Sequence, residues 1–107
     1  MVKTLDSYDA FKAATSTDKL VVIDFWATWC GPCKVIGPVF EKLEPTFPDL
    51  EFFKCDVDDQ EQIAGEVGIK AMPTFAFYKN GEKVGTVVGA DPNKLRDALK
   101  HHSEASA

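Results

Sequence analysis

The chain has 107 residues, of which 45% are hydrophobic and 27% are charged. This length and composition are typical of one ordinary globular domain, so we expect residues 1–107 to fold as a single domain with its own core. The 17 acidic and 12 basic residues give a net charge of -5, which argues against a nucleic-acid-binding surface. No apolar run approaches the roughly 18 to 20 residues of a membrane span, and no signal-peptide pattern opens the sequence. We therefore expect a cytoplasmic protein that does not contact membranes.

Strands and helices are predicted to alternate along the first half of the chain. An opening strand at 2–5 and a helix at about 7–14 come first. The run LVVIDFWA at 20–27 is apolar on both alternation phases, which is typical of a central strand buried on both faces. From 31 to about 44 the apolar residues recur at helical spacing, so the strand leads directly into a helix, which Pro38 should kink.

A second strand and a short helix are predicted next. The strand is LEFFKCDV at 50–57, and the helix runs to Val67 with Asp58 or Asp59 as its N-cap. A β-α-β-α order of this kind indicates a sheet whose first strands are parallel.

The last third of the chain predicts an antiparallel edge and a final helix. Strands at 74–78 and 82–89 are joined through Asn80-Gly81, a strong hairpin signal. Asp91 is the predicted N-cap of the last helix, and disorder is expected only in the tail from 102 to 107. The predicted fold class is α/β, with a central mixed five-stranded sheet flanked by four helices.

Two of the three cysteines lie two residues apart in WATWCGPCK, residues 26–34. Such a pair could hold a metal, staple the fold or exchange electrons. Three cysteines are an odd number and too few for a disulfide-built scaffold in a reducing compartment. A zinc site would need two more ligands, and Cys55, His101 and His102 offer no zinc-binding spacing. The pattern favours redox chemistry without a metal.

The predicted position of the pair at a helix N-terminus gives each cysteine a role. With Cys30 as N-cap and Cys33 three residues later, the two side chains are close enough for a disulfide that opens and closes with little backbone movement. Gly31 and Pro32 occupy first-turn positions that need no backbone donor. The helix dipole favours a thiolate at Cys30, which we expect to be the more exposed cysteine and the nucleophile. Cys33 is then the resolving cysteine, which attacks the mixed disulfide.

The segments VVIDFWATWCGPCK and AMPTFAFYKNGE resemble the thioredoxin family, small eukaryotic cytosolic and fungal members among them. The order of elements matches over essentially the whole chain. The resemblance implies the thioredoxin fold and a protein-disulfide reductase that maintains cell redox homeostasis. No nucleotide fingerprint is present, so we expect no bound cofactor, and the resemblance implies electrons from NADPH through a separate flavoprotein, thioredoxin reductase. It also implies disulfide-bearing clients, such as peroxiredoxin, methionine sulfoxide reductase and ribonucleotide reductase, and a mainly monomeric protein.

Asp24 is unusual because it interrupts the apolar strand at 20–27. A buried carboxylate is costly unless it is neutral, paired or hydrated, so its pKa should be raised. The resemblance implies a proton relay between Asp24 and Cys33, whereas the alternative is a solvated, edge-facing aspartate. Lys54 resembles the family's lysine near that carboxylate and could tune it, although it could equally be an ordinary exposed lysine.

The expected client-binding surface surrounds the cysteine pair. The resemblance implies a cis peptide bond before Pro73, which would let the Met72 backbone pair with an extended client strand. A flat and mostly apolar rim is expected from Trp29, Gly31, Pro32, Met72, Pro73, Gly89 and Ala90. Cys55 is expected to be a buried, inert thiol, with oxidative dimerisation or glutathionylation as the alternative.

Two other functions remain open at this point. The first is an oxidant of the disulfide isomerase type, although the Gly-Pro pair between the cysteines resembles the reducing members of the family. The second is a binding module whose thiols only assist a larger complex. Activity that survives both Cys30→Ser and Cys33→Ser would favour the binding module.

Overall fold

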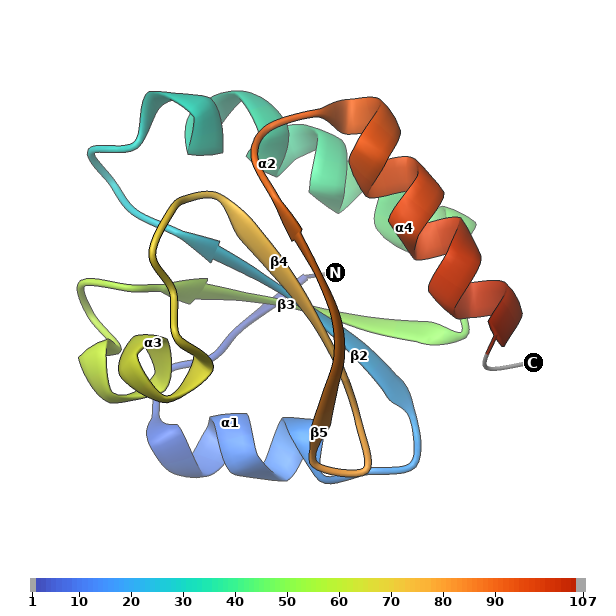
Figure 1. Cartoon of the computed structure of the whole chain (residues 1–107), viewed down its shortest axis with the longest axis horizontal. Coiled ribbons are helices and arrows are strands. Elements are labelled where there is room, and N and C mark those ends of the chain that lie inside the picture. The colour runs from blue at the N-terminus through green and yellow to red at the C-terminus, as the bar shows by residue number, and fades with distance from the viewer. Residues whose placement is uncertain (1, 106–107) are drawn as a thin grey trace.

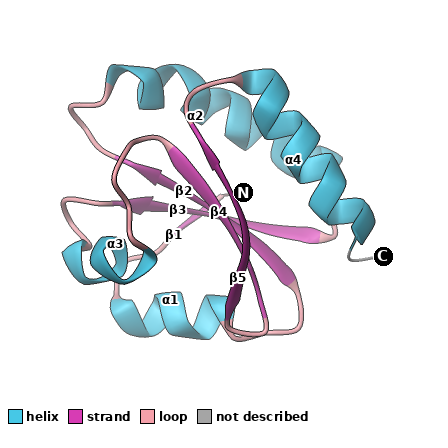
Figure 2. Cartoon of the chain, in the orientation of Figure 1, coloured by secondary structure: helices cyan, strands magenta, loops and turns pink. Residues whose placement is uncertain are grey.

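The computed structural model describes residues 2–105 as a five-stranded sheet with helices on both faces (Figures 1 and 2). The strands are β1 (Lys3–Thr4), β2 (Leu20–Trp26), β3 (Leu50–Asp56), β4 (Thr74–Lys79) and β5 (Glu82–Val88). The helices are α1 (Tyr8–Thr15), α2 (Gly31–Leu43), α3 (Glu61–Val67) and α4 (Pro92–Ala105), with a short 3₁₀ turn at Glu44–Thr46. No helix in this part of the chain is long and apolar enough to cross a membrane.

The strand order is β1-β3-β2-β4-β5, which confirms the predicted mixed sheet. β1, β3 and β2 are parallel, and β4 and β5 add an antiparallel edge. β2 therefore lies in the middle of the sheet, and its carboxyl end leads into α2. Figure 1 shows α2 and α4 over one face and α1 and α3 over the other.

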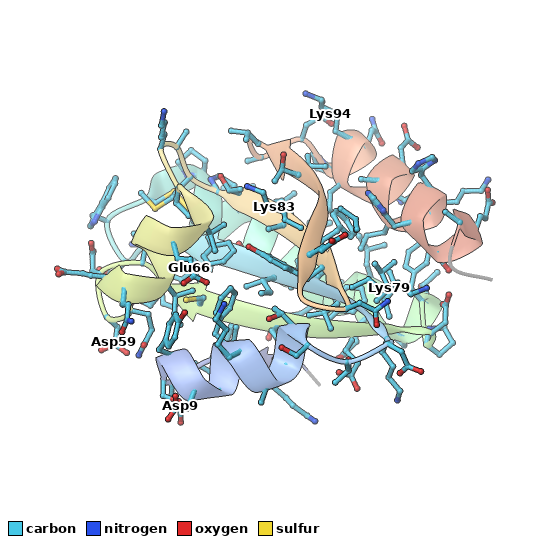
Figure 3. All side chains as sticks on the ribbon, turned by 60° about the horizontal axis from the view of Figure 1, so that its bottom comes forward. Asp9, Asp59, Glu66, Lys79, Lys83 and Lys94 are labelled. Carbon is cyan, nitrogen blue, oxygen red and sulfur yellow. A yellow bond between two sulfur atoms is a disulfide. The ribbon has the colours of Figure 1, made fainter. Side chains whose placement is uncertain are left out.

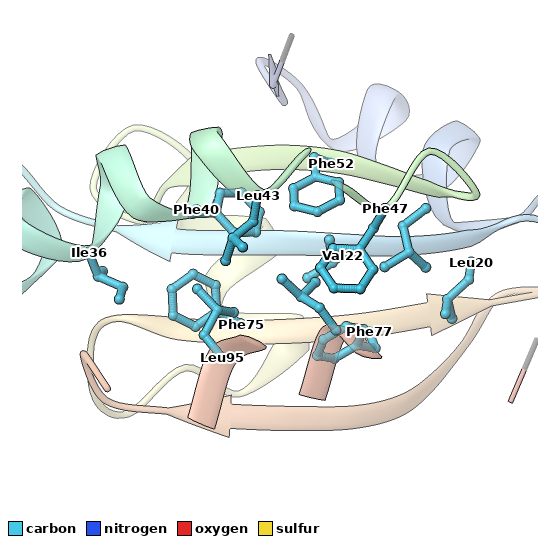
Figure 4. Packing of buried hydrophobic residues seen from close by; sticks show 12 residues of the cluster. Leu20, Val22, Ile36, Phe40, Leu43, Phe47, Phe52, Phe75, Phe77 and Leu95 are labelled. Atoms are coloured by element: carbon cyan, nitrogen blue, oxygen red, sulfur yellow. The ribbon is translucent and has the colours of Figure 1, made fainter. Parts of the chain in front are cut away.

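The two faces of the sheet carry separate apolar clusters. Phe40, Phe75 and Leu95 belong to the cluster that lies beneath α2 and α4 (Figure 4). Phe11 and Ile63 belong to the cluster against α1 and α3. β2 contributes to both clusters because its side chains alternate between the faces, and this explains why its sequence is apolar on both phases.

Local signals fix the start of α4 and the turn between β4 and β5. Asp91 caps α4 as predicted, because its Oδ1 accepts the N–H groups of Asn93 and Lys94 at 3.0 and 3.2 Å. Asn80 and Gly81 have φ angles of 53° and 81°, the left-handed pair that a tight hairpin turn requires. α2 continues through Pro38.

The predicted cap of α3 is wrong. The N-cap is Gln60, which makes no side-chain capping bond. Asp58 and Asp59 lie in the preceding turn, where their N–H groups donate to Oδ1 of Asp56 at 2.9 and 3.4 Å. The Asp56 carboxylate at the end of β3 thus organises this turn, and the helix begins later than the local sequence indicated.

The predicted disorder of the C-terminal tail is also wrong for residues 102–105, which belong to α4. The His102 ring stacks on Phe77 with the centroids 4.1 Å apart, and the Ser103 hydroxyl donates to Asp49 at 2.6 Å. These long-range contacts stabilise the last turn of the helix. The remaining two tail residues, 106 and 107, lie outside the described residues.

Candidate active site

Cys30 and Cys33 form a disulfide at the N-terminus of α2, with their Cα atoms 5.3 Å apart. Cys30 is the N-cap, and its Sγ accepts the backbone N–H of Cys33 at 3.2 Å. Gly31 and Pro32 fill the first turn, as the sequence predicted. The same N–H group and the positive end of the helix dipole would stabilise a Cys30 thiolate once the disulfide is reduced.

The two cysteines are almost equally exposed to solvent in this oxidised structure. Cys30 is 5% exposed and Cys33 is 4% exposed, so the expected difference between them is absent. Their neighbours differ instead. Cys33 lines a pocket that reaches Asp24, and Cys30 does not line it. The arrangement therefore gives Cys33, and not Cys30, access to a buried acid.

Asp24 is the only charged side chain that is buried among residues 2–105, at 4% exposure. Other charged groups, such as Asp9, Asp59 and Lys94, lie on the outside of the molecule instead (Figure 3). Oδ1 of Asp24 has no hydrogen-bond partner within the described chain. Burial raises the pKa of Asp24 to about 7, with Lys54 lowering it and Glu41 raising it further. The solvated, edge-facing alternative is therefore wrong.

The pocket beside Asp24, which we call the Asp24 pocket, has a volume of about 190 Å³. Its side chains with polar or ionisable groups come from β2, β3 and α2, and they are Asp24, Trp26, Cys33, Lys34, Glu41 and Lys54. The indole Nε1 of Trp26 is buried and, like Asp24 Oδ1, has no hydrogen-bond partner in residues 2–105. A volume of this size admits water, which could bond to both atoms.

Lys54 reaches the Asp24 pocket because β3 pairs with β2 in a register that places Lys54 directly beside Asp24. Its ammonium lies 3.9 Å from Oε1 of Glu41, which α2 contributes. The predicted neighbourhood of Asp24 and Lys54 is therefore present. Glu41 was not singled out from the sequence, although it lies two helical turns after Cys33 and hence on the same face of α2.

Some of the residues expected for a client-binding rim lie at the disulfide, where Met72 packs against the buried cluster that contains Cys30 and Cys33. Trp29 is 67% exposed, and its indole Nε1 donates to Oδ2 of Asp58 at 2.8 Å. The Met72–Pro73 peptide bond is cis, and the N–H of Gly89 donates to the carbonyl of Pro73 at 2.9 Å. Trp29, Met72 and Gly89 are at least partly accessible, whereas Pro73 itself is buried.

The sequence analysis missed Asp58 as a partner of Trp29. A signal for it was available, because the parallel pairing of β2 and β3 brings their carboxyl ends together. The N–H of Val57 donates to the carbonyl of Trp26, and Asp58 is the next residue. A predicted register for the two strands would have placed Asp58 near the cysteine loop.

Cys55 lies on β3 and is completely buried. Burial first, and then Asp56 and Asp59, raise the pKa of its thiol to about 12. Such a thiol stays protonated at neutral pH, which agrees with the expectation of a buried thiol without a redox role. In the described part of the chain, no three His, Cys, Asp or Glu side chains are grouped so that they could hold a metal ion.

Comparisons with known proteins agree with this arrangement. A protein-family model described as Thioredoxin matches residues 2–101. A thioredoxin from Malassezia sympodialis is 64% identical over 104 residues, which cover 95% of this chain and 99% of that protein.

Solved structures agree as well. The crystal structure of Malassezia sympodialis thioredoxin matches with a TM-score of 0.94 and 63% identity, covering 96% of this chain and 91% of that one. A chain from a structural study of how a yeast mitochondrial 1-Cys peroxiredoxin is resolved through glutathione/thioredoxin systems matches with a TM-score of 0.88 and 40% identity. That match covers 94% of each chain.

Proposed function

The chain belongs to the thioredoxin family and is a dithiol–disulfide oxidoreductase of it, and from this premise we propose that it acts as a reductase of disulfide bonds in client proteins. The observation that carries the proposal is the Cys30–Cys33 disulfide at the N-terminus of α2, with only Cys33 lining the Asp24 pocket. The first cysteine then has the thiolate-stabilising position, and the second has the proton acceptor.

The reaction begins with the reduced dithiol. The Cys30 thiolate attacks one sulfur of the client disulfide, and the other client sulfur leaves as a thiolate that takes up a proton. The Cys33 thiol then gives its proton to Asp24 and attacks Cys30 in the mixed disulfide. The Cys30–Cys33 disulfide forms, and the second client sulfur leaves and is protonated. The protein loses two electrons, and the client gains them as two thiols.

The proton step is assigned to Asp24 because it lines the same pocket as Cys33 and has a pKa raised to about 7. A carboxyl with a pKa near the working pH can both accept and release a proton without a large cost. Water in the Asp24 pocket could carry the proton between the two groups. Lys54 tunes Asp24 through its nearby positive charge, which favours the carboxylate.

Client docking is assigned to the rim around the disulfide. The exposed face of Trp29 offers apolar area, and the backbone of Met72 can pair with an extended client segment. Gly31, Pro32, Pro73, Gly89 and Ala90 complete this proposed surface. Because main-chain pairing needs no particular client side chain, such a surface accepts many disulfides.

The proposal also includes the source of the electrons and the partner proteins. We expect NADPH to supply the electrons through a separate flavoprotein, a thioredoxin reductase, and a single cytoplasmic domain of 107 residues to work mainly as a monomer. Peroxiredoxin is one expected client, and the similarity to a chain from a study of peroxiredoxin resolution supports this expectation. Methionine sulfoxide reductase and ribonucleotide reductase are further expected clients.

Reduction of insulin with NADPH and a thioredoxin reductase tests the proposal. Cys30→Ser should abolish turnover, and Cys33→Ser should accumulate a mixed disulfide with the client, because nothing resolves it. Cys55→Ala is the matched control and should keep full activity, since the Cys55 thiol is buried in a different cluster from Cys30 and Cys33. Turnover by Cys30→Ser would overturn the nucleophile assignment, and function that survives both serine variants would indicate a binding module instead.

A further inference from the structure

Glu41 is an acid at the Asp24 pocket that the reaction above does not use. Cys33, Gly37 and Glu41 all line the pocket, because a spacing of four residues keeps side chains on one face of α2. Glu41 therefore extends toward the same space as the resolving cysteine, from two turns further along the helix.

The Lys54 ammonium forms an ion pair with Glu41 rather than with Asp24. Nζ of Lys54 lies 3.9 Å from Oε1 of Glu41, and within residues 2–105 no ion pair joins Lys54 to Asp24. This is so although Lys54 and Asp24 are direct partners in the β2–β3 register. The side chains of Lys54 and Glu41 are 37% and 53% exposed, and exposed pairs of this kind add little to stability. A contribution to folding is thus a weak explanation for the pair.

We propose that Glu41 is a positioning residue for proton transfer at Cys33, because its carboxylate pairs with the Lys54 ammonium and keeps it from a direct ion pair with Asp24. The inference rests on the proposed reductase function, and it adds a residue that sets the strength of the base. Without this anchor the flexible Lys54 side chain could turn toward the unpartnered Oδ1 of Asp24 and form a direct ion pair.

The charges that face Asp24 come from two elements. β3 contributes Lys54, and α2 contributes Glu41 and Lys34, together with the Cys33 thiol in the reduced protein. Lys54 lowers the pKa of Asp24 and Glu41 raises it. Neutralising Glu41 removes the negative charge that raises the pKa of Asp24. It also frees the Lys54 ammonium to approach Asp24, which lowers that pKa further. Asp24 then becomes a weaker base for the Cys33 proton.

The test is an NMR titration of the Asp24 carboxyl carbon in the oxidised protein. Glu41→Gln should move the midpoint to lower pH by roughly half a unit or more, and Glu41→Asp should restore part of the loss because the charge returns on a shorter side chain. Glu51→Gln is the matched control, because Glu51 also pairs with a lysine, Lys19 at 3.6 Å, but does not line the pocket. Its midpoint should equal that of the wild type.

A double-mutant cycle tests whether Glu41 acts through Lys54. Lys54→Gln alone should raise the Asp24 midpoint. Adding Glu41→Gln to Lys54→Gln should then produce less than half of the shift that Glu41→Gln produces in the wild type. Equal shifts in the two backgrounds would overturn the proposal, because Glu41 would then act only by its own charge. An unchanged midpoint in Glu41→Gln would overturn it as well.

The titration stays informative if the proposed function fails. It reads Asp24 directly in the oxidised protein and needs neither client nor reductase, whereas the function is tested by insulin reduction with Cys30→Ser. A second readout belongs to the reaction: the acid limb of the rate of insulin reduction should move to lower pH in Glu41→Gln. A purely structural role for Glu41 would change stability and leave this pH profile in place.

Discussion

Asp24 carries a cost in folding that its chemical role would explain. The side chain is 4% exposed, lacks a partner for Oδ1, and has a pKa raised from 3.8 to about 7. If Asp24 had only a structural role, an apolar residue at this position would give the folded protein at least the same stability. Its place beside Cys33 in the Asp24 pocket gives the carboxyl a use that offsets this cost.

Asp24→Asn should stabilise the protein at neutral and alkaline pH. The folded pKa of Asp24 is above its unfolded value, so between pH 4 and pH 7 this carboxyl is more protonated in the folded protein than in the unfolded chain, and its contribution to stability falls as the pH rises. The loss can reach about 4 kcal/mol above pH 7, and an asparagine does not have it. Urea unfolding of the oxidised protein at pH 4, 6 and 8 measures the difference.

The gap between Asp24→Asn and the wild type should therefore widen from pH 4 to pH 8. Comparing the slopes removes the constant effect of burying an amide in place of an acid. Asp18→Asn, at an exposed position, should run parallel to the wild type. Parallel curves for Asp24→Asn would show that Asp24 titrates normally in the folded protein.

At this scale, the sequence predicts a residue well when its environment is local. The burial of Asp24 followed from the apolar run around it, and the N-cap position of Cys30 followed from its place before Gly31 and Pro32. Asp58 and Glu41 were missed because their contacts with Trp29 and Lys54 depend on how β2, β3 and α2 pack. Charge alone does not indicate such partners.

The close approach of α4 to β5 is the main feature at the scale of elements. A Cβ atom at Gly85 would lie 2.6 Å from Nε2 of His102 and 2.8 Å from its Cε1. The His102 ring occupies this space while it stacks on Phe77. The glycine thus allows the last turns of α4 to pack on the sheet, which the local sequence of the tail did not indicate.

Gly85→Ala should have opposite effects in two backgrounds. In the wild type the added methyl displaces His102 from Phe77, so the free energy of unfolding should fall by about 1 kcal/mol. In His102→Ala the space is free, and alanine should stabilise β5 by roughly 0.5 to 1 kcal/mol because glycine loses more conformational entropy on folding. Urea unfolding of the four proteins checks this reversal of sign. Equal effects in both backgrounds would mean that His102 does not fill the space above Gly85.

Across elements, the predictions succeed where a short signal fixes a boundary. The hairpin at Asn80-Gly81 and the cap at Asp91 are signals of this kind. The start of α3 and the end of α4 depend instead on the Asp56 carboxylate and on the packing of His102. Both are interactions that the local sequence does not contain, and both boundaries were predicted wrongly.

At the scale of the whole molecule, the sheet separates two apolar cores, and the Asp24 pocket shares a residue with one of them. The cluster beneath α2 and α4 includes Phe40, which also lines the Asp24 pocket. The cluster against α1 and α3 includes Phe11, which is equally buried and packs edge-on against Tyr78. The alternation of strands and helices predicted this layered fold, because each helix needs an apolar face to cover. It could not predict which core supports the site.

Phe40→Ala and Phe11→Ala should therefore reduce stability alike but affect the site differently. Each leaves a cavity under the sheet and should cost about 3 to 5 kcal/mol, in a single urea transition seen equally by circular dichroism and tryptophan fluorescence. Only Phe40→Ala enlarges the Asp24 pocket, which hydrates Asp24 and should bring the NMR midpoint of its carboxyl down toward 3.8. Phe40→Leu and Phe11→Leu repeat the comparison at lower cost if an alanine variant does not fold. A comparable fall of the midpoint in the Phe11 variants would show that the two cores do not act on the site separately.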